Sequence, residues 1–176
     1  APDATGALEL SSVRVVDELA ALAEDGVLPP LSRCGALLAG DLFSAPDAMK
    51  RGGFGDVGVA WRAFHERCAW VAGVAGNHDD VSAVPRGVRV LDAEVQTCGG
   101  LRVGGVGLIS GDPRRPGRRL EVDQLAAVEL VAQQQPDVVV LHEGPGGDAG
   151  QRGHPCIPLS PALTVCGHVH WEEPWF

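Results

Sequence analysis

The sequence predicts a mixed α/β domain, and two observations carry this prediction. Apolar residues alternate between the spacing of amphipathic helices and short continuous runs, which are typical of strands covered on both faces. Polar side chains follow directly on four of these runs, at Asp41, Asn77, His142 and His168. Because ligand sites in α/β sheets gather at the carboxyl ends of strands, we expect these positions to meet at one edge. The 176 residues fit a single domain, residues 1–176.

Three segments have helical spacing. Residues 12–25 form an amphipathic pattern that ends before Gly26, and further helices are expected near 57–67 and 120–133. The predicted buried face of the first helix consists of Val15, Val16, Leu19, Leu22 and Ala23. That of the third consists of Leu125, Val128, Val131 and Ala132.

The predicted strands fall into two groups. Four precede the polar positions, at residues 35–40, 70–74, 137–141 and 162–166. Short hairpin-like strands are expected at residues 88–90, 94–98 and 101–109, broken by Gly99-Gly100 and Gly104-Gly105. The run 103–107 lacks the spacing of a phosphate-binding glycine loop and a following helix, so we interpret it as a strand with close sheet packing.

Charge and composition exclude some partners and compartments. The net charge of −9 disfavours long nucleic acid, whose binding requires many basic residues. No run approaches the roughly 20 apolar residues of a membrane span, and no signal peptide is recognisable at the start. The five cysteines contain no C-x-x-C pair and suggest buried free thiols. These features predict a cytoplasmic protein that does not enter a membrane, with protein partners left open.

Each polar position alone is a weak signal. A Gly-Asp step after a strand is usually a turn, and a histidine at a strand end is usually a hydrogen-bonded edge residue. The pair His168 and His170 is stronger, because residues i and i+2 of an extended segment project to the same side. Two neighbouring imidazoles favour a bound cation, although exposed histidine pairs also exist.

Together these elements resemble the calcineurin-like metallophosphoesterase family. Gly40-Asp41, Gly76-Asn77-His78-Asp79, His142 and Gly167-His168-Val169-His170 occur in the order of that family, and the resemblance spans about residues 12–171. It implies a β-sandwich of mixed sheets flanked by helices. It further implies that Asp41 bridges two metal ions, that Asn77, His142 and His168 bind the second ion, and that His170 binds the first. His78 would face the substrate, and Asp79 would orient His78.

These residue types suit phosphoester hydrolysis. Two cations roughly 3.5–4 Å apart neutralise the phosphate and acidify a bridging water, which yields a hydroxide nucleophile. A mixed nitrogen and oxygen ligand set favours Mn, Fe, Co, Ni or Zn, of which we expect Mn. His78 would assist at the leaving group, and Asp79 would fix its tautomer. The expected substrate is a small phosphodiester or phosphomonoester.

One departure from the family leaves alternatives open. The Asp-x-His motif that supplies further ligands to the first ion is absent, so the fold is expected to lack its first strand, and activity is in doubt. Because only residues 171–176 follow His170, the C-terminal strands of the family are expected to be missing as well. The chain is then a fragment, or a natural variant with an incomplete site. A non-catalytic scaffold and a module with one structural ion are the alternatives to a hydrolase.

Three further features are candidates for substrate contact or support. The basic segment with Arg114 and Arg115 is either a solvated loop or an anion clamp. His154 either contacts the substrate or is a loop residue without a functional contact. Glu143, which follows His142, is either solvated or bonded to a ligand histidine.

Overall fold

The computed structural model describes residues 11–43, 53–146, 153–158 and 162–168. Its helices are α1 (Ser11–Glu24), α2 (Gly58–His65), α3 (Glu121–Gln133) and a short 3-10 helix (Leu31–Arg33). Its strands are β1 (Gly35–Leu38), β2 (Gly55–Asp56), β3 (Trp70–Gly73), β4 (Asp79–Asp80), β5 (Arg89–Val90), β6 (Glu94–Cys98), β7 (Leu101–Val106), β8 (Ile109–Ser110), β9 (Arg118–Arg119), β10 (Val138–Leu141) and β11 (Leu163–Cys166). The prediction of a mixed α/β chain is confirmed, and the three predicted helices lie within two residues of their expected bounds.

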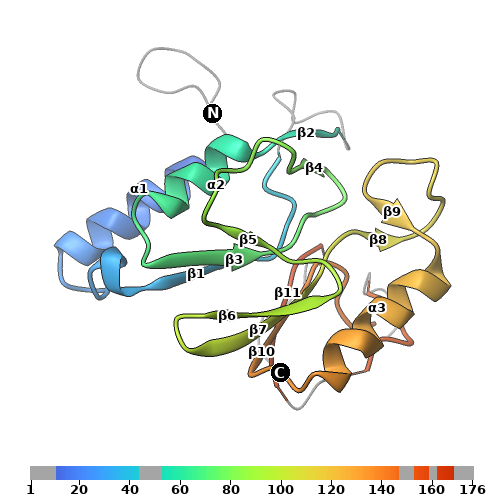
Figure 1. Ribbon diagram of the computed structural model, residues 1–176. Coiled ribbons are helices and arrows are strands. Elements are labelled where there is room, and N and C mark those ends of the chain that lie inside the picture. The colour runs from blue at the N-terminus through green and yellow to red at the C-terminus, as the bar shows by residue number, and fades with distance from the viewer. Residues whose placement is uncertain (1–10, 44–52, 147–152, 159–161, 169–176) are drawn as a thin grey trace.

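Two larger sheets form the centre of the described structure (Figure 1). The first has the order β1-β3-β5, and its strands are parallel. The second has the order β11-β10-β7-β6, in which only β6 runs antiparallel to its neighbour. Two short parallel pairs, β2-β4 and β8-β9, lie beside them. Parallel pairing of β1 with β3, and of β10 with β11, brings the carboxyl ends of each pair to one edge.

Three apolar clusters hold the layers together. One lies between α1, α2 and the first sheet, and it contains Trp61. A second lies under α3, against the outer face of the second sheet, and contains Val131. The third joins the two sheets and includes Ala72 of β3, Val103 of β7 and Val140 of β10. The layers therefore run helix, sheet, sheet, helix, and the sheets are covered on both faces, as continuous apolar strands require.

Two details of the predicted helix faces are wrong. In α1 only Val16 is buried, whereas Val15 and Leu22 are 46% and 40% exposed. In α3 Ala132 is exposed, and the polar Gln124 is fully buried instead. The Gln124 amide donates to the carbonyls of Gly107 and Leu108, so a hydrogen-bond demand of the backbone places this polar residue in the core.

The cysteines are free, as predicted, but only Cys98 among the five is buried and Cys156 is exposed. None of the helices in the described part of the chain is long and apolar enough to cross a membrane.

Gly104 and Gly105 do not break the strand, contrary to the prediction, but lie inside β7. The interpretation of residues 103–107 as a strand with close packing is correct for these two glycines. A Cβ atom on Gly104 would lie 2.5 Å from Val131 of α3. A Cβ atom on Gly105 would lie 2.5 Å from the Leu91 Cβ and 2.8 Å from Val74. The pair lets β7 approach a helix on one face and the other sheet on the opposite face.

Substituting Gly105 by alanine is expected to destabilise the protein by about 1–3 kcal/mol, because the added methyl overpacks the junction between the sheets. Urea denaturation monitored by circular dichroism measures this change. Thr97→Val, at an exposed position of the neighbouring strand β6, serves as the control and should change stability little. Equal stability of Gly105→Ala and wild type would show that the sheets can separate without cost.

Candidate metal centre

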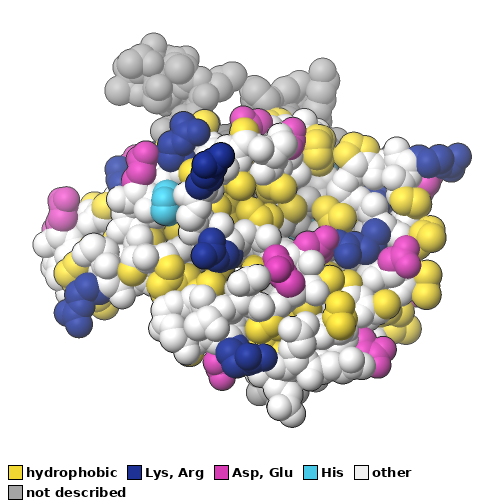
Figure 2. All heavy atoms as spheres, in the orientation of Figure 1, with side chains coloured by type: hydrophobic (Ala, Val, Ile, Leu, Met, Phe, Trp, Pro, Cys, Tyr) yellow, Lys and Arg dark blue, Asp and Glu magenta, His cyan; other side chains and the backbone are white. Residues whose placement is uncertain are grey.

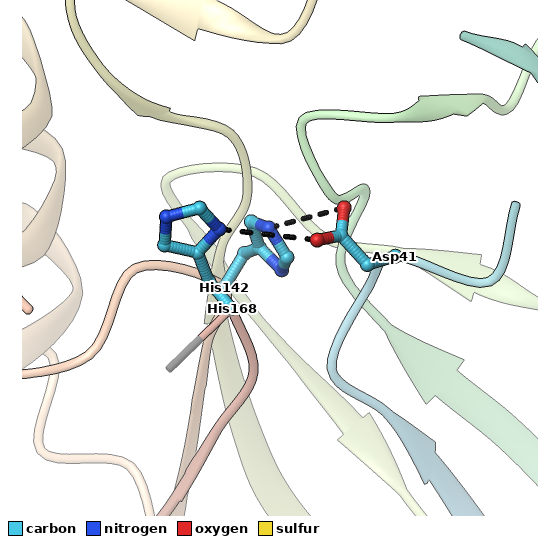
Figure 3. Close-up of side chains that lie close together, drawn as sticks. All are labelled: Asp41, His142 and His168. Carbon is cyan, nitrogen blue, oxygen red and sulfur yellow. Dashed lines mark ion pairs between the residues drawn. The ribbon is translucent and has the colours of Figure 1, made fainter. Parts of the chain in front are cut away.

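The four predicted strand-end positions meet where the carboxyl ends of the two sheets adjoin. Asp41 follows β1, Asn77 follows β3, His142 follows β10 and His168 follows β11. One donor atom each of Asp41, His142 and His168 lie within 4.8 Å of one another, and Figure 3 shows both imidazoles directed at the Asp41 carboxylate. The structure thus brings together side chains that are up to 127 positions apart in the sequence (41 to 168).

His142 has a fixed orientation at the centre of this group. Its side chain is fully buried, and its Nδ1 lies 2.8 Å from the Ala39 carbonyl oxygen. A carbonyl only accepts hydrogen bonds, so Nδ1 carries a proton. Nε2 therefore faces inward, 3.1 Å from Asn77 Oδ1 and 3.3 Å from Asp41 Oδ1. Metal-binding histidines usually donate their second ring nitrogen to such a carbonyl.

This arrangement favours a positive charge at Nε2. In a neutral imidazole with the proton on Nδ1, the Nε2 lone pair would face two oxygen atoms, which repel it. Burial lowers the pKa of His142 and is the largest single influence, but the hydrogen bond and charge of Asp41, the Ala39 carbonyl and the charge of Asp79 together outweigh it, and the pKa is raised above its ordinary value. A divalent cation can take this position, with two oxygen ligands and one nitrogen already arranged around it.

Asp41 and His168 complete the described part of the group. His168 Nδ1 lies 3.8 Å from Asp41 Oδ2, and the rings of His142 and His168 have centroids 5.2 Å apart. Burial raises the pKa of Asp41, but its interactions with His142 and His168, together with the charge of His78, outweigh burial and hold the pKa well below its ordinary value. Both Asp41 and His168 have positive φ angles, 55° and 59°, a conformation that non-glycine residues adopt rarely and in which Asp and His are enriched.

A strand-end glycine permits the close approach of these segments. Gly40 has a φ of 85°, and a Cβ atom there would lie 2.6 Å from His142 Nδ1 and 2.5 Å from the Gly76 nitrogen. Any larger residue would push the Asp41 segment away from His142. The glycine preceding Asp41 is therefore a steric requirement of the site.

His78 borders the group through its backbone as well as its ring. Its N–H donates to Asp41 Oδ1 at 3.2 Å, and its Nδ1 lies 2.6 Å from the Gly53 carbonyl oxygen. The carbonyl places the proton on Nδ1, so Nε2 is the ring nitrogen left for other partners. The side chain is partly exposed, which suits a group that meets a ligand from solvent.

The predicted role of Asp79 in orienting His78 is not what the structure has. Asp79 is 3% exposed, and its two oxygens accept hydrogen bonds from the backbone N–H groups of Phe43 and Gly76, each at 2.9 Å. Both carboxylate oxygens of Asp79 are therefore occupied by backbone N–H groups. His78 Nδ1 instead contacts the Gly53 carbonyl oxygen. Asp79 ties the loop after Asp41 to the loop that carries Asn77.

Asp79→Asn is expected to lower the free energy of unfolding by about 1–3 kcal/mol, because one buried backbone N–H would then face an amide N–H₂ group. Urea denaturation is the measurement. Asp80→Asn is the matched control: the partly exposed carboxylate of Asp80 bonds locally to Ser82, and its loss should have little effect. Similar stability losses for both variants would contradict the linking role of Asp79.

Glu143 was expected to be solvated or bonded to a ligand histidine, and it is neither in the described structure. It is 9% exposed, and its Oε2 accepts hydrogen bonds from Ser110 N at 2.9 Å and from Ser110 Oγ at 2.7 Å. This contact ties the end of β10 to β8. The nearby Gly117 packs so closely on the Asn77 backbone that a Cβ atom would collide with it. Long-range contacts of this kind leave no signal in the sequence.

The predicted substrate contacts are not brought into the Asp41 group. The Arg114 side chain is 88% exposed and forms an ion pair with Asp112 within its own loop. Arg115 is exposed, and its backbone N–H bonds the Asp112 carbonyl. The buried ring of His154 contacts Glu121 and the Cys156 N–H. His170, the predicted ligand of the first ion, lies outside the described residues.

No protein-family model matches the chain, and none of the curated proteins compared with it matches. The functional argument therefore rests on the residues and on the geometry they adopt.

Proposed function

We propose that this chain is a calcineurin-like metallophosphoesterase that hydrolyses a small phosphodiester or phosphomonoester with divalent transition-metal ions. The observation that supports this most directly is at His142: Nδ1 is held by the Ala39 carbonyl, and Nε2 faces Asn77 Oδ1 and Asp41 Oδ1. With His168, these residues offer two oxygen and two nitrogen donors, a set that suits Mn, Fe, Co, Ni or Zn.

The layering of the fold is compatible with this proposal. Two sheets pack face to face with helices outside, and the candidate ligands lie at the carboxyl ends of β1, β3, β10 and β11. We infer that this is the sandwich expected from the family resemblance. On the face drawn in Figure 2, basic and acidic side chains are interspersed, which suits a small substrate better than a long polyanion.

The chain's own residues have separable tasks in the proposed reaction. When bound, the metal ions supply positive charge against the phosphoryl oxygens and acidify the attacking water. Asp41, Asn77, His142 and His168 hold the ions in place. The Gly53 carbonyl keeps a proton on His78 Nδ1, so His78 Nε2 is the atom that interacts with the leaving oxygen and, when protonated, transfers a proton to it.

The test is metal content combined with hydrolysis by the same protein preparation. Wild-type protein is freed of metal with a chelator, reloaded with Mn²⁺, and assayed with an aryl phosphodiester and an aryl phosphomonoester. Bound metal per chain is counted in parallel by elemental analysis. Turnover that depends on Mn²⁺, with two metal equivalents per chain, supports the proposal.

Other outcomes separate the alternatives. One equivalent without turnover favours a single structural ion or a scaffold that has lost its activity, and it contradicts the hydrolase. Turnover that survives full metal removal overturns the proposal as well. Absence of any bound metal would also overturn the proposal.

A further inference from the structure

A second group of metal-ligating side chains lies at the start of α3, apart from the Asp41 group. It consists of Glu121, the first residue of α3, and of His154 and Cys156 from the segment between β10 and β11. One donor atom of each residue lies within 4.8 Å of the others. His154 Nε2 is 3.2 Å from Glu121 Oε1, and the His154 side chain is 9% exposed. We propose that these three residues form a separate binding site for a thiophilic divalent cation, with zinc as the expected ion.

The scaffold on both sides of this group is fixed. The His154 backbone is bonded to the strand end after β10, since its N–H donates to the Gly144 carbonyl at 3.0 Å and its carbonyl accepts from Gly146 N at 2.8 Å. Ile157, 3% exposed, packs in the cluster under α3 that also contains Val131. The segment that carries His154 and Cys156 is thus anchored to the same core as the helix that carries Glu121, and ligands on fixed elements lose little freedom on binding an ion.

The donor types select a different metal from that of the Asp41 group. A carboxylate, an imidazole and a thiolate match the ligands of zinc, and three protein ligands leave a fourth tetrahedral position open. The Asp41 group offers oxygen and nitrogen only, whereas a thiolate favours softer ions such as zinc and cobalt over manganese. Glu121 is 64% exposed and lines a surface hollow of about 660 Å³, so an ion can reach it from solvent.

The hydrogen bonds of His154 determine which contacts change when an ion binds. His154 Nδ1 accepts the Cys156 N–H at 3.2 Å, so a neutral ring carries its proton on Nε2 and donates it to Glu121. An ion at Nε2 takes the place of that proton, and the neutral ring then carries its single proton on Nδ1. Binding therefore breaks one weak hydrogen bond from Cys156, an exposed residue whose N–H water can reach, and gains bonds to three ligands. The Cys156 thiol releases its proton to solvent when its thiolate binds.

Cobalt(II) reports on this site without interference from the other. Titration of the metal-free chain with Co²⁺ is expected to produce the near-ultraviolet charge-transfer absorption of a thiolate bound to cobalt. The Asp41 group contains no sulfur, so the band should persist in Asp41→Asn. It should vanish in Cys156→Ser, and Glu121→Gln should weaken cobalt binding by more than the roughly 10–100-fold that outer-shell changes cause. Zinc added afterwards should bleach the band.

The controls make the outcome decisive and independent of phosphoester hydrolysis. Cys34→Ser alters a thiol that bonds only the Pro29 and Pro30 carbonyls among its described contacts, and it should leave the band intact. Cys156 is exposed, so its replacement by serine should leave the fold unchanged by circular dichroism. No band in wild type, or a band that survives Cys156→Ser, would overturn the site and leave Glu121 and His154 as a simple ion pair. Loss of hydrolysis in Asp41→Asn bears on the proposed function alone.

Discussion

Asp41→Asn is expected to abolish metal-dependent hydrolysis and to remove most metal binding at the Asp41 group. The substitution keeps the shape of the side chain but replaces an anion that faces both His142 and His168. The loss in metal affinity should exceed the roughly 10–100-fold that removal of an outer-shell partner causes. The loss in turnover should exceed the roughly 10²–10³-fold that removal of one oxyanion-hole donor causes.

Isothermal titration with Mn²⁺ and the aryl phosphodiester assay measure these two effects. The control is Asp25→Asn, which removes one negative charge from an exposed position just beyond α1. It separates the local role of Asp41 from the general attraction of an acidic chain for cations. If both variants bind Mn²⁺ as tightly as wild type, Asp41 is not a ligand and the proposed centre is wrong.

His78→Ala is expected to lower kcat by about 10²–10⁴-fold while metal content stays at the wild-type level. The structure separates the two effects, because residue 78 contacts Asp41 through its backbone N–H, which alanine retains. The side chain contributes the ring that the Gly53 carbonyl orients. Steady-state kinetics and elemental analysis of the same samples provide the measurement.

The leaving group of the substrate tests the chemical role assigned to His78. An aryl leaving group with a low pKa needs little protonation, so the defect of His78→Ala should be smaller with a nitrophenyl ester than with an alkyl ester. His65→Ala, a partly buried histidine at the end of α2, is the control and should change neither rate. An equal defect with both leaving groups would argue against proton transfer, and a loss of metal would indicate a ligand or structural role instead.

Much of the element order was accessible from sequence because local patterns determine it. Helix bounds followed from apolar spacing and from turn signals such as Gly26, which has a positive φ of 74° at the end of α1. The candidate site positions followed from polar residues at strand ends, since parallel strands present their carboxyl ends at a common edge. The structure brings Asp41, Asn77, His142 and His168 together as that reasoning expects, while their roles as metal ligands stay a prediction.

Other features depend on contacts between distant segments, and there the sequence failed. Asp79 was assigned to His78 because the family resemblance implies that role, but its oxygens accept hydrogen bonds from the Phe43 and Gly76 N–H groups, and the Gly53 carbonyl contacts His78 instead. Every residue has a backbone carbonyl, so sequence cannot indicate which one meets a ring nitrogen. Gln124 was missed for a related reason, because its burial depends on backbone carbonyls in another segment.

The sequence by itself determined the three helices, the longer strands and the polar side chains that follow those strands, whereas the two-residue strands β2, β4 and β9 lie outside the predicted elements. Only the tertiary structure decided how those side chains are used. The pairing of β1 with β3 and of β10 with β11, and the packing of one sheet on the other, set the distances among Asp41, His142 and His168. The same packing put Glu121 beside His154. The physical reason is that propensity and periodicity act over a few residues, whereas ligand geometry depends on contacts between elements far apart in the chain.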